Sequence, residues 1–122
     1  AVYRSGDGGA VWARVAGGDA VALHVRSAGA GVWVLEPRSV RVLDVAEDGP
    51  AVPLERGEQF TSWGWDADRI WLGTNRGLWL WDAVGARRIW QGGRVTSVWP
   101  EAGKIFLGTD GLGVQAAAAA GP

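Results

Sequence analysis

The heptapeptide RIWLGTN at residues 69–75 recurs 35 residues later as KIFLGTD at residues 104–110. All seven positions are identical or chemically equivalent, and the two copies align without a gap. The same offset places FTS at residues 60–62 over VTS at residues 95–97. An internal repeat of this kind indicates a protein built from similar units that stack along the chain.

A more diverged copy of the unit lies upstream. The segments VWVL at 32–35 and VRVLD at 40–44 align with IWLG at 70–73 and LWLWD at 78–82, at an offset of 38 residues. Inside each unit, apolar residues alternate with a period of two, and the runs end at Gly, Asp, Asn or Pro. This pattern predicts short β-strands rather than helices.

The best-preserved unit predicts four strands, at residues 59–64, 69–74, 77–82 and 86–91. The neighbouring units are expected to begin with strands at residues 20–25 and 95–99. Four antiparallel strands in about 40 residues are typical of one blade of a β-propeller. We therefore predict an all-β chain, a β-propeller fragment of about three four-stranded antiparallel blades and about thirteen strands, which forms an incomplete ring.

The predicted blades divide the chain at the repeat boundaries. They are a partial blade at residues 1–17, blades at residues 18–56 and 57–92, and a partial blade at residues 93–115. The Ala-rich residues 116–122 are of low complexity and are left outside the fold. A β-sandwich also uses short strands, but it gives no reason for the same Gly-Thr-Asn/Asp turn to follow the same aromatic strand twice.

Residue size predicts how the blades pack. Small residues on the first strand of a unit should lie where the sheets converge: Thr61, Ser62, Thr96 and Ser97. Large aromatic residues on the second and third strands should fill the space between blades: Trp71, Trp79 and Phe106. The 20 glycines and 9 tryptophans suit this combination of tight turns and large aromatic side chains.

Composition excludes several classes of protein. The 122 residues include no Cys, so neither a disulfide nor a Cys-based metal site can form. A net charge of −1 does not fit a polybasic nucleic-acid binder. No run of 18 apolar residues predicts a membrane span, and no signal peptide is seen. Because residue 1 is not Met, we expect a piece of a longer protein.

Residues 5–12 read SGDGGAVW and match the Asp-box pattern S-x-D-x-G-x-x-W at Ser5, Asp7, Gly9 and Trp12. This segment resembles the BNR-like repeat of sialidases, sortilin-type receptors and photosystem II assembly-factor propellers. The resemblance implies a turn in which the Ser and Asp side chains bond turn amides and the Trp folds back over the turn. It also implies a structural role on the outer rim, away from any substrate.

Other units are similar to different propeller families. Residues 70–78 resemble the repeats of two-component-regulator propellers, and residues 80–90 resemble quinoprotein-type repeats. These resemblances agree on the fold and differ on function.

No catalytic constellation is visible in the sequence. Sialidase chemistry requires a cluster of Arg and a Tyr nucleophile, and the sole tyrosine, Tyr3, lies on the strand that leads into the Asp-box. His24 has no second His or Cys to complete a zinc site, and we expect it to pack at the place of Trp63. Asp66 and Asp68 could hold calcium or simply be solvated. We predict no catalytic residue, metal or cofactor.

The candidate partner-binding residues are aromatic and basic. Trp63 and Trp65 end the first strand of their unit, on the face where propellers most often bind ligands, although packing between blades is the alternative. Arg76, Arg87 and Arg88 lie in or near turns, where a guanidinium can meet a carboxylate of a partner.

Closed propellers need four to eight blades, so further blades or other chains should complete the ring. A homo-oligomer is one way, with strands from two copies sharing a composite blade. The function we expect is a non-catalytic, protein-binding or assembly scaffold in an extracytoplasmic location. Two alternatives stay open: a glycan-binding or sialidase-like propeller with its active residues in missing blades, and the sensor propeller of a two-component regulator.

Overall fold

Antiparallel β-sheets make up the chain. The computed structural model describes residues 2–16, 21–28, 31–43, 49–111 and 113–118. These residues form twelve strands in four separate antiparallel sheets, and they include no helix. The prediction of an all-β chain is confirmed.

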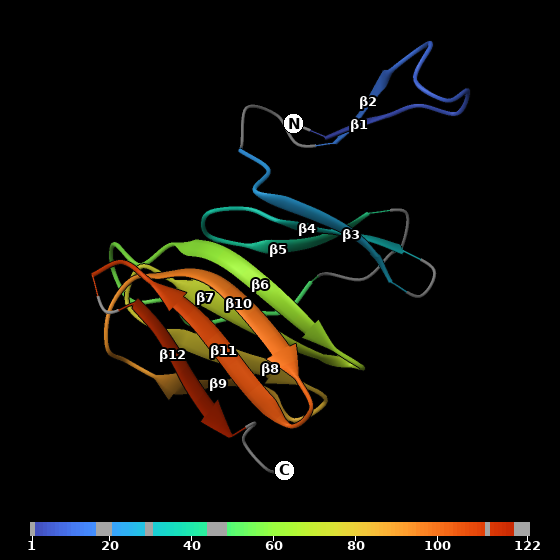
Figure 1. Cartoon of the computed structure of the whole chain (residues 1–122). Coiled ribbons are helices and arrows are strands. Elements are labelled where there is room, and N and C mark those ends of the chain that lie inside the picture. The colour runs from blue at the N-terminus through green and yellow to red at the C-terminus, as the bar shows by residue number, and fades with distance from the viewer. Residues whose placement is uncertain (1, 17–20, 29–30, 44–48, 112, 119–122) are drawn as a thin grey trace.

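Each sheet consists of strands that are consecutive in the chain (Figure 1). The first sheet is a hairpin of β1 (Val2–Arg4) and β2 (Ala13–Ala16). The second contains β3 (His24–Ala28), β4 (Gly31–Leu35) and β5 (Val40–Leu43). The third contains β6 (Phe60–Asp66), β7 (Arg69–Thr74), β8 (Leu78–Asp82) and β9 (Gly85–Trp90). The fourth contains β10 (Val95–Glu101), β11 (Lys104–Thr109) and β12 (Gly113–Ala118).

The third sheet matches the four strands predicted for its unit to within two residues at each end. The second sheet differs, because residues 49–56 form no fourth strand there. Pro50 and Pro53 lack the N–H that a sheet ladder needs. Val52 and Leu54 instead pack as a loop against the core beside the third sheet. Residues 44–48 lie outside the described part of the chain.

The Ala-rich end of the chain contributes to the last sheet. β12 runs to Ala118 and pairs antiparallel with β11 along its whole length. Residues 116–122 were predicted to lie outside the fold, and this prediction is wrong for residues 116–118. Strand pairing uses backbone groups, so short side chains do not prevent it. Residues 119–122 lie outside the described residues.

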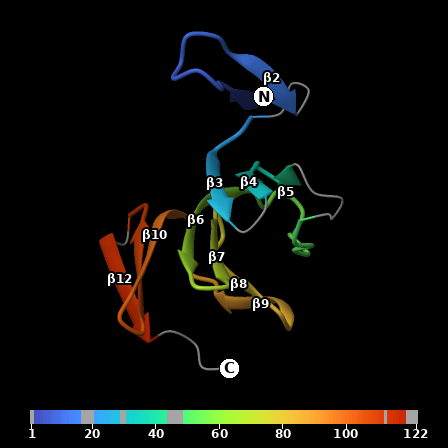
Figure 2. The ribbon, with the colours of Figure 1, turned by 90° about the vertical axis from the view of Figure 1, so that its right-hand side faces the viewer.

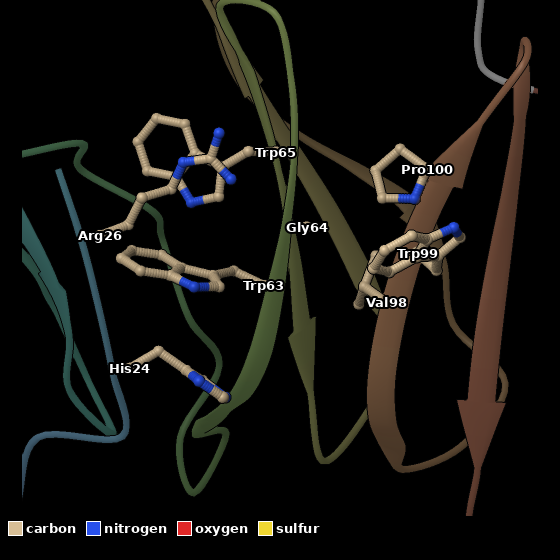
Figure 3. Close-up of a pocket in the computed structure, with 8 residues that line it drawn as sticks. All are labelled: His24, Arg26, Trp63, Gly64, Trp65, Val98, Trp99 and Pro100. Atoms are coloured by element: carbon tan, nitrogen blue, oxygen red, sulfur yellow. The ribbon is translucent and has the colours of Figure 1, made fainter. Parts of the chain in front are cut away.

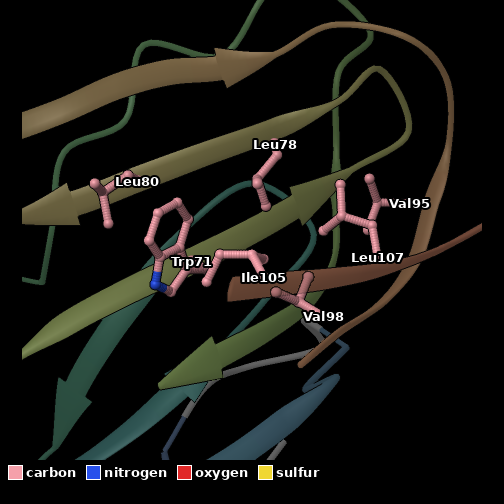
Figure 4. Close-up of a cluster of buried hydrophobic side chains, with 7 residues drawn as sticks. All are labelled: Trp71, Leu78, Leu80, Val95, Val98, Ile105 and Leu107. Carbon is pink, nitrogen blue, oxygen red and sulfur yellow. The ribbon is translucent and has the colours of Figure 1, made fainter. Parts of the chain in front are cut away.

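The third sheet is covered on both faces by its neighbours, as Figure 2 shows. One buried cluster, drawn in Figure 4, joins it to the fourth sheet: Trp71, Leu78, Leu80, Val95, Val98, Ile105 and Leu107. The other joins it to the second sheet: Leu35, Val40, Phe60, Ile70, Leu72 and Trp79. Successive residues of β7 therefore face opposite sheets, as the period of two requires.

The predicted aromatic fillers are confirmed in two cases of three. Trp71 is fully buried and Trp79 nearly so, each between two sheets. Phe106 is only partly buried. It follows Ile105 on β11, and Ile105 faces the third sheet, so Phe106 points to the opposite face, which no described sheet covers.

Small residues lie where β6 and β10 approach each other. The Thr61 hydroxyl donates a hydrogen bond to the Val95 carbonyl oxygen across this junction. A Cβ at Gly64 would lie 2.7 Å from Pro100 Cδ and 3.0 Å from Val98 Cγ1. The close approach therefore depends on the missing side chain of Gly64.

The β1–β2 hairpin lies apart from the other three sheets (Figures 1 and 2). Its large side chains Tyr3, Val11 and Trp12 are all exposed. The hairpin therefore does not contribute to either buried cluster.

Replacement of Gly64 tests the junction between β6 and β10. We expect Gly64→Ala to lower the free energy of unfolding by about 1–3 kcal/mol, because the added methyl group overlaps Pro100. Gly6→Ala is the control, since a Cβ there meets nothing within 4 Å, and its effect should stay within about 0.5 kcal/mol. Urea denaturation measures both, and equal stabilities of the two variants would contradict the assignment.

Candidate functional site

An aromatic groove lies where the first strands of the last three sheets come together (Figure 3). It is an open cavity of about 380 Å³. Its lining comes from β3, β6 and β10: His24, Arg26, Trp63, Gly64, Trp65, Val98, Trp99 and Pro100. Three sheets that are distant in sequence thus contribute to one site, which we call the aromatic groove.

Trp63 and Trp65 point from β6 toward β3, on the side away from β10 (Figure 3). Their ring centroids are 5.3 Å apart and nearly perpendicular, and Trp33 of β4 meets Trp65 in a second edge contact, also at 5.3 Å. Such edge-to-face pairs are favourable beyond the area that they bury. Both predicted tryptophans are half-buried, so they pack between sheets and line the groove as well.

His24 packs on the same aromatic cluster. Its ring stacks on Trp63, with the two centroids 6.3 Å apart. His24 was predicted to occupy the place of Trp63, but the strand register aligns it with Ser62. His24 pairs with Leu35, just as Ser62 pairs with Gly73, the counterpart of Leu35 in the repeat. His24 is exposed and its ring contact is with Trp63, and the predicted alignment was one residue out.

Arg26 gives the groove its positive charge. Its guanidinium lies over the Trp65 ring, 4.9 Å from the centroid, a cation–π contact. Within the described chain Arg26 has no ion pair, and no Asp or Glu lines the groove. The Nε1 of Trp65 is buried and has no acceptor among the described residues. The groove therefore offers hydrogen-bond donors and positive charge beside aromatic surface.

Sequence reasoning missed Trp33, Arg26 and Trp99 as parts of this site. Trp33 and Trp99 do carry a signal. Trp33 is the repeat counterpart of Trp71, and Trp99 replaces Gly64 at an offset of 35 residues. Arg26 carries no such signal, because its role depends on how β3 is placed beside β6.

Two of the three predicted arginines bind carboxylates of this chain, at the buried Glu58 and at the exposed Glu55. Arg88 meets both carboxylate oxygens of Glu58, at 2.7 and 2.9 Å, and lies over the Trp79 ring at 4.4 Å. Arg76 pairs with Glu55 at 2.9 Å. These guanidiniums hold the segment before β6 against the third sheet. The carboxylates that they bind belong to this chain and not to a partner.

Glu58 is the centre of this network and is fully buried. Burial alone would raise the pKa of Glu58, but hydrogen bonds from Arg88, Thr74, the Glu55 amide and Trp79 outweigh it and lower the pKa to about 2. The carboxylate is therefore ionised at neutral pH. A buried charge with four donors is a structural anchor.

Arg87 also binds an internal carboxylate. Its two terminal nitrogens lie 3.0 and 2.9 Å from the two oxygens of Asp82. This bidentate pair, with the Val84 amide, lowers the pKa of Asp82 to about 2. The pair closes the turn between β8 and β9.

The carboxylates considered for calcium are not arranged around an ion. Asp66 forms an ion pair with Arg69 at 2.5 Å. Among the described residues, no group of three or more His, Cys, Asp or Glu side chains could hold a metal ion.

The turn between β1 and β2 is held by the hydrogen bonds that its resemblance implied. Asp7 Oδ1 accepts from the amides of Ala10 and Val11, at 3.1 and 3.0 Å. Ser5 Oγ accepts from the Gly9 amide at 2.8 Å, and Trp12 Nε1 donates back to the Gly9 carbonyl oxygen at 3.0 Å. Gly9 adopts a φ of 101°, a conformation that favours glycine. The Val11 amide and Ser5 hold the pKa of Asp7 below its usual range.

Comparisons with known proteins address the fold. No family model matches the sequence, and no curated protein is similar to it. Among solved structures, the chain is similar to the crystal structure of the computationally designed Ika4 protein, with a TM-score of 0.60 and 11% sequence identity. The match covers 77% of this chain and 63% of the designed chain. At this identity the likeness concerns the fold alone. Within the part described here, no helix has the length and apolar character to cross a membrane.

The Glu58 network predicts a specific dependence of stability on pH. The pKa of Glu58 in the folded chain lies below its ordinary value, so its contribution is complete above about pH 4.5 and is lost as the pH falls through about 2. At pH 7, Glu58→Gln should lower the free energy of unfolding by about 3 kcal/mol, because Arg88 loses its buried partner. The difference from wild type should shrink between pH 5 and pH 2.

Urea denaturation across this pH range measures the effect. Glu101→Gln removes an exposed carboxylate and should change stability by less than about 1 kcal/mol. A difference between Glu58→Gln and wild type that stays constant with pH would contradict the role of Glu58.

Asp7 should control local order in the hairpin turn. We expect Asp7→Ala to speed hydrogen exchange at the Ala10 and Val11 amides several-fold, because both lose their acceptor. Asp68→Ala, in another exposed turn, is the control. Amide exchange followed by NMR reports each site, and unchanged rates in Asp7→Ala would show that the carboxylate does not hold the turn.

Proposed function

We propose that the chain is a run of β-propeller blades that acts as a non-catalytic binding module, with the aromatic groove as its binding site. The propeller assignment is supported by the repeat of about 35 to 38 residues, by the stacking of consecutive sheets, and by the likeness of the hairpin turn to an Asp-box. The observation that carries the function is the groove itself, where the first strands of three sheets supply its lining.

The composition of the groove fits a protein partner. Trp and Arg are the residues most enriched among those that dominate binding energy at protein interfaces. Trp99 is 65% exposed and makes one side-chain hydrogen bond, to Glu101. Trp63 and Trp65 are already fixed by packing, so little side-chain entropy is lost when a partner binds them.

The positive charge of Arg26 indicates that the partner carries a negatively charged group. A carboxylate on the partner would meet the Arg26 guanidinium, whose planar fork suits two parallel hydrogen bonds. An adjacent aromatic residue or proline would pack on Trp99, whose ring is largely exposed. We infer an extended peptide segment in which Asp or Glu lies next to an apolar ring.

A glycan is the second candidate, because tryptophan rings also suit sugar stacking. The contacts of the groove favour the peptide, since one face of Trp65 carries Arg26 and Trp63 carries His24. A pyranose ring would have to displace these side chains. Trp99 alone is largely exposed.

Selection from a displayed library of random peptides tests this function. The wild-type chain should enrich sequences with Asp or Glu beside an aromatic residue or proline. Arg26→Ala should weaken binding of the enriched peptides by about tenfold or more, the loss expected for one charge-assisted pair. Trp99→Ala should weaken it similarly, since it removes the exposed aromatic platform.

Arg56→Ala is the matched control, because Arg56 is an exposed arginine outside the groove. It should bind the enriched peptides as wild type does. Enrichment of no sequence class, or equal losses in Arg26→Ala and Arg56→Ala, would reject the groove as a peptide site. Binding to a glycan array that is lost in Trp99→Ala would favour the second candidate instead.

A further inference from the structure

We propose that two copies of this chain associate head to tail, with the face of β10–β12 that carries Phe106 and Val114 in one copy stacked on the face of β3–β5 that carries Val25 and Val32 in the other. The proposal goes beyond peptide binding, because its two faces lie outside the aromatic groove except at Trp99, which borders both. The sheet junction that this chain already contains supports it.

The existing junction defines which positions meet. Trp71 and Leu78 of the third sheet are at most 2% exposed, because Val98, Ile105 and Leu107 of the fourth sheet cover them. The two sets come from opposite faces of their units. The junction is therefore heterologous: the first kind of face, with Trp71 and Leu78, packs on a second and different kind, with Val98, Ile105 and Leu107.

The fourth sheet repeats the first kind of face and leaves it open. Gly108 is the counterpart of Gly73, and Val114 pairs with Gly108 as Leu78 pairs with Gly73. Phe106 likewise stands at the place of Trp71. Val114 is 73% exposed, whereas Leu78 is 2% exposed. Trp99, which pairs with Phe106, extends the same apolar face.

The second sheet repeats the other kind of face at the opposite end of the stack. Val25 pairs with Val34 as Val98 pairs with Leu107, so Val25 stands at the place of Val98. Val32 similarly stands at the place of Ile105. Val25 is 54% exposed and Val32 is partly exposed, while Val34 is already buried. This face therefore has the positions that cover Trp71 and Leu78 inside the chain.

Each copy thus carries exposed apolar residues on one kind of face and exposed apolar residues on the matching kind. Apolar side chains on two such faces leave water when one copy stacks on another. Exchange of strands between copies is a different route, since it would extend a sheet at its edge and would not cover its face. The contact we propose is therefore stacking of sheet faces.

Three matched substitutions of exposed valines test the proposal. Val114→Lys places a charge on the face of the fourth sheet, and Val25→Lys places one on the face of the second. Val84→Lys is the control, in the turn between β8 and β9, where Val84 is 85% exposed. Light scattering after size exclusion gives the mass of each, and circular dichroism with thermal melting confirms that each is folded.

Wild type and Val84→Lys should exceed the monomer mass of 12.9 kDa increasingly with concentration. Val114→Lys and Val25→Lys should each remain monomeric when alone. An equal mixture of these two should form a species of about twice 12.9 kDa and no larger, because one intact pair of faces remains.

A monomeric wild type at every concentration overturns the proposal. Association of either charged variant with itself, or a mixture that stays monomeric, overturns the head-to-tail arrangement. If Val114→Lys fails to fold, Phe106→Lys on the same face replaces it in the mixture. Peptide binding by Val25→Lys distinguishes this proposal from the proposed function, since Val25 lies on the face of β3 opposite His24 and Arg26.

Discussion

A β-sheet with apolar side chains on both faces has to be covered on both, and the third sheet of this chain is such a sheet. Ile70 and Leu72 face one neighbour, and Trp71 faces the other. Because successive residues of β7 face opposite neighbours, the third sheet lies between the second and the fourth. The neighbours approach most closely at β6 and β10, where Gly64 removes a side chain that would separate them. The groove lies at this same junction, so packing of the sheets also positions its tryptophans.

The buried Glu58 carboxylate adds a polar constraint to this apolar stack. It binds groups from three different strands, namely Thr74, Trp79 and Arg88. Its own segment, just before β6, is thereby fixed relative to the rest of the third sheet. A charge in this position stabilises only an arrangement that brings all its partners together, so it favours one register over others. Apolar packing alone is less selective, because it depends on area more than on direction.

Much of the third sheet could be predicted from the sequence, since its repeat and its period of two are strong signals. The second sheet was less predictable because Pro50 and Pro53 interrupt the segment in which a fourth strand was expected. The candidate site was predicted in part. Trp63 and Trp65 line the groove, but the partners of Arg88 and Arg76 could not be foreseen. Glu58 and Arg88 are 30 residues apart and meet only after the strands pair.

The recurrence of one junction has a consequence for how such a chain changes in evolution. Ile70 and Leu72 in one layer, and Ile105 and Leu107 in the next, face the preceding layer from the same register positions. A tandem duplication of one unit therefore inserts a layer whose two faces match the faces of its neighbours. The number of layers can grow or shrink by whole units, while the turns between strands diverge under separate selection.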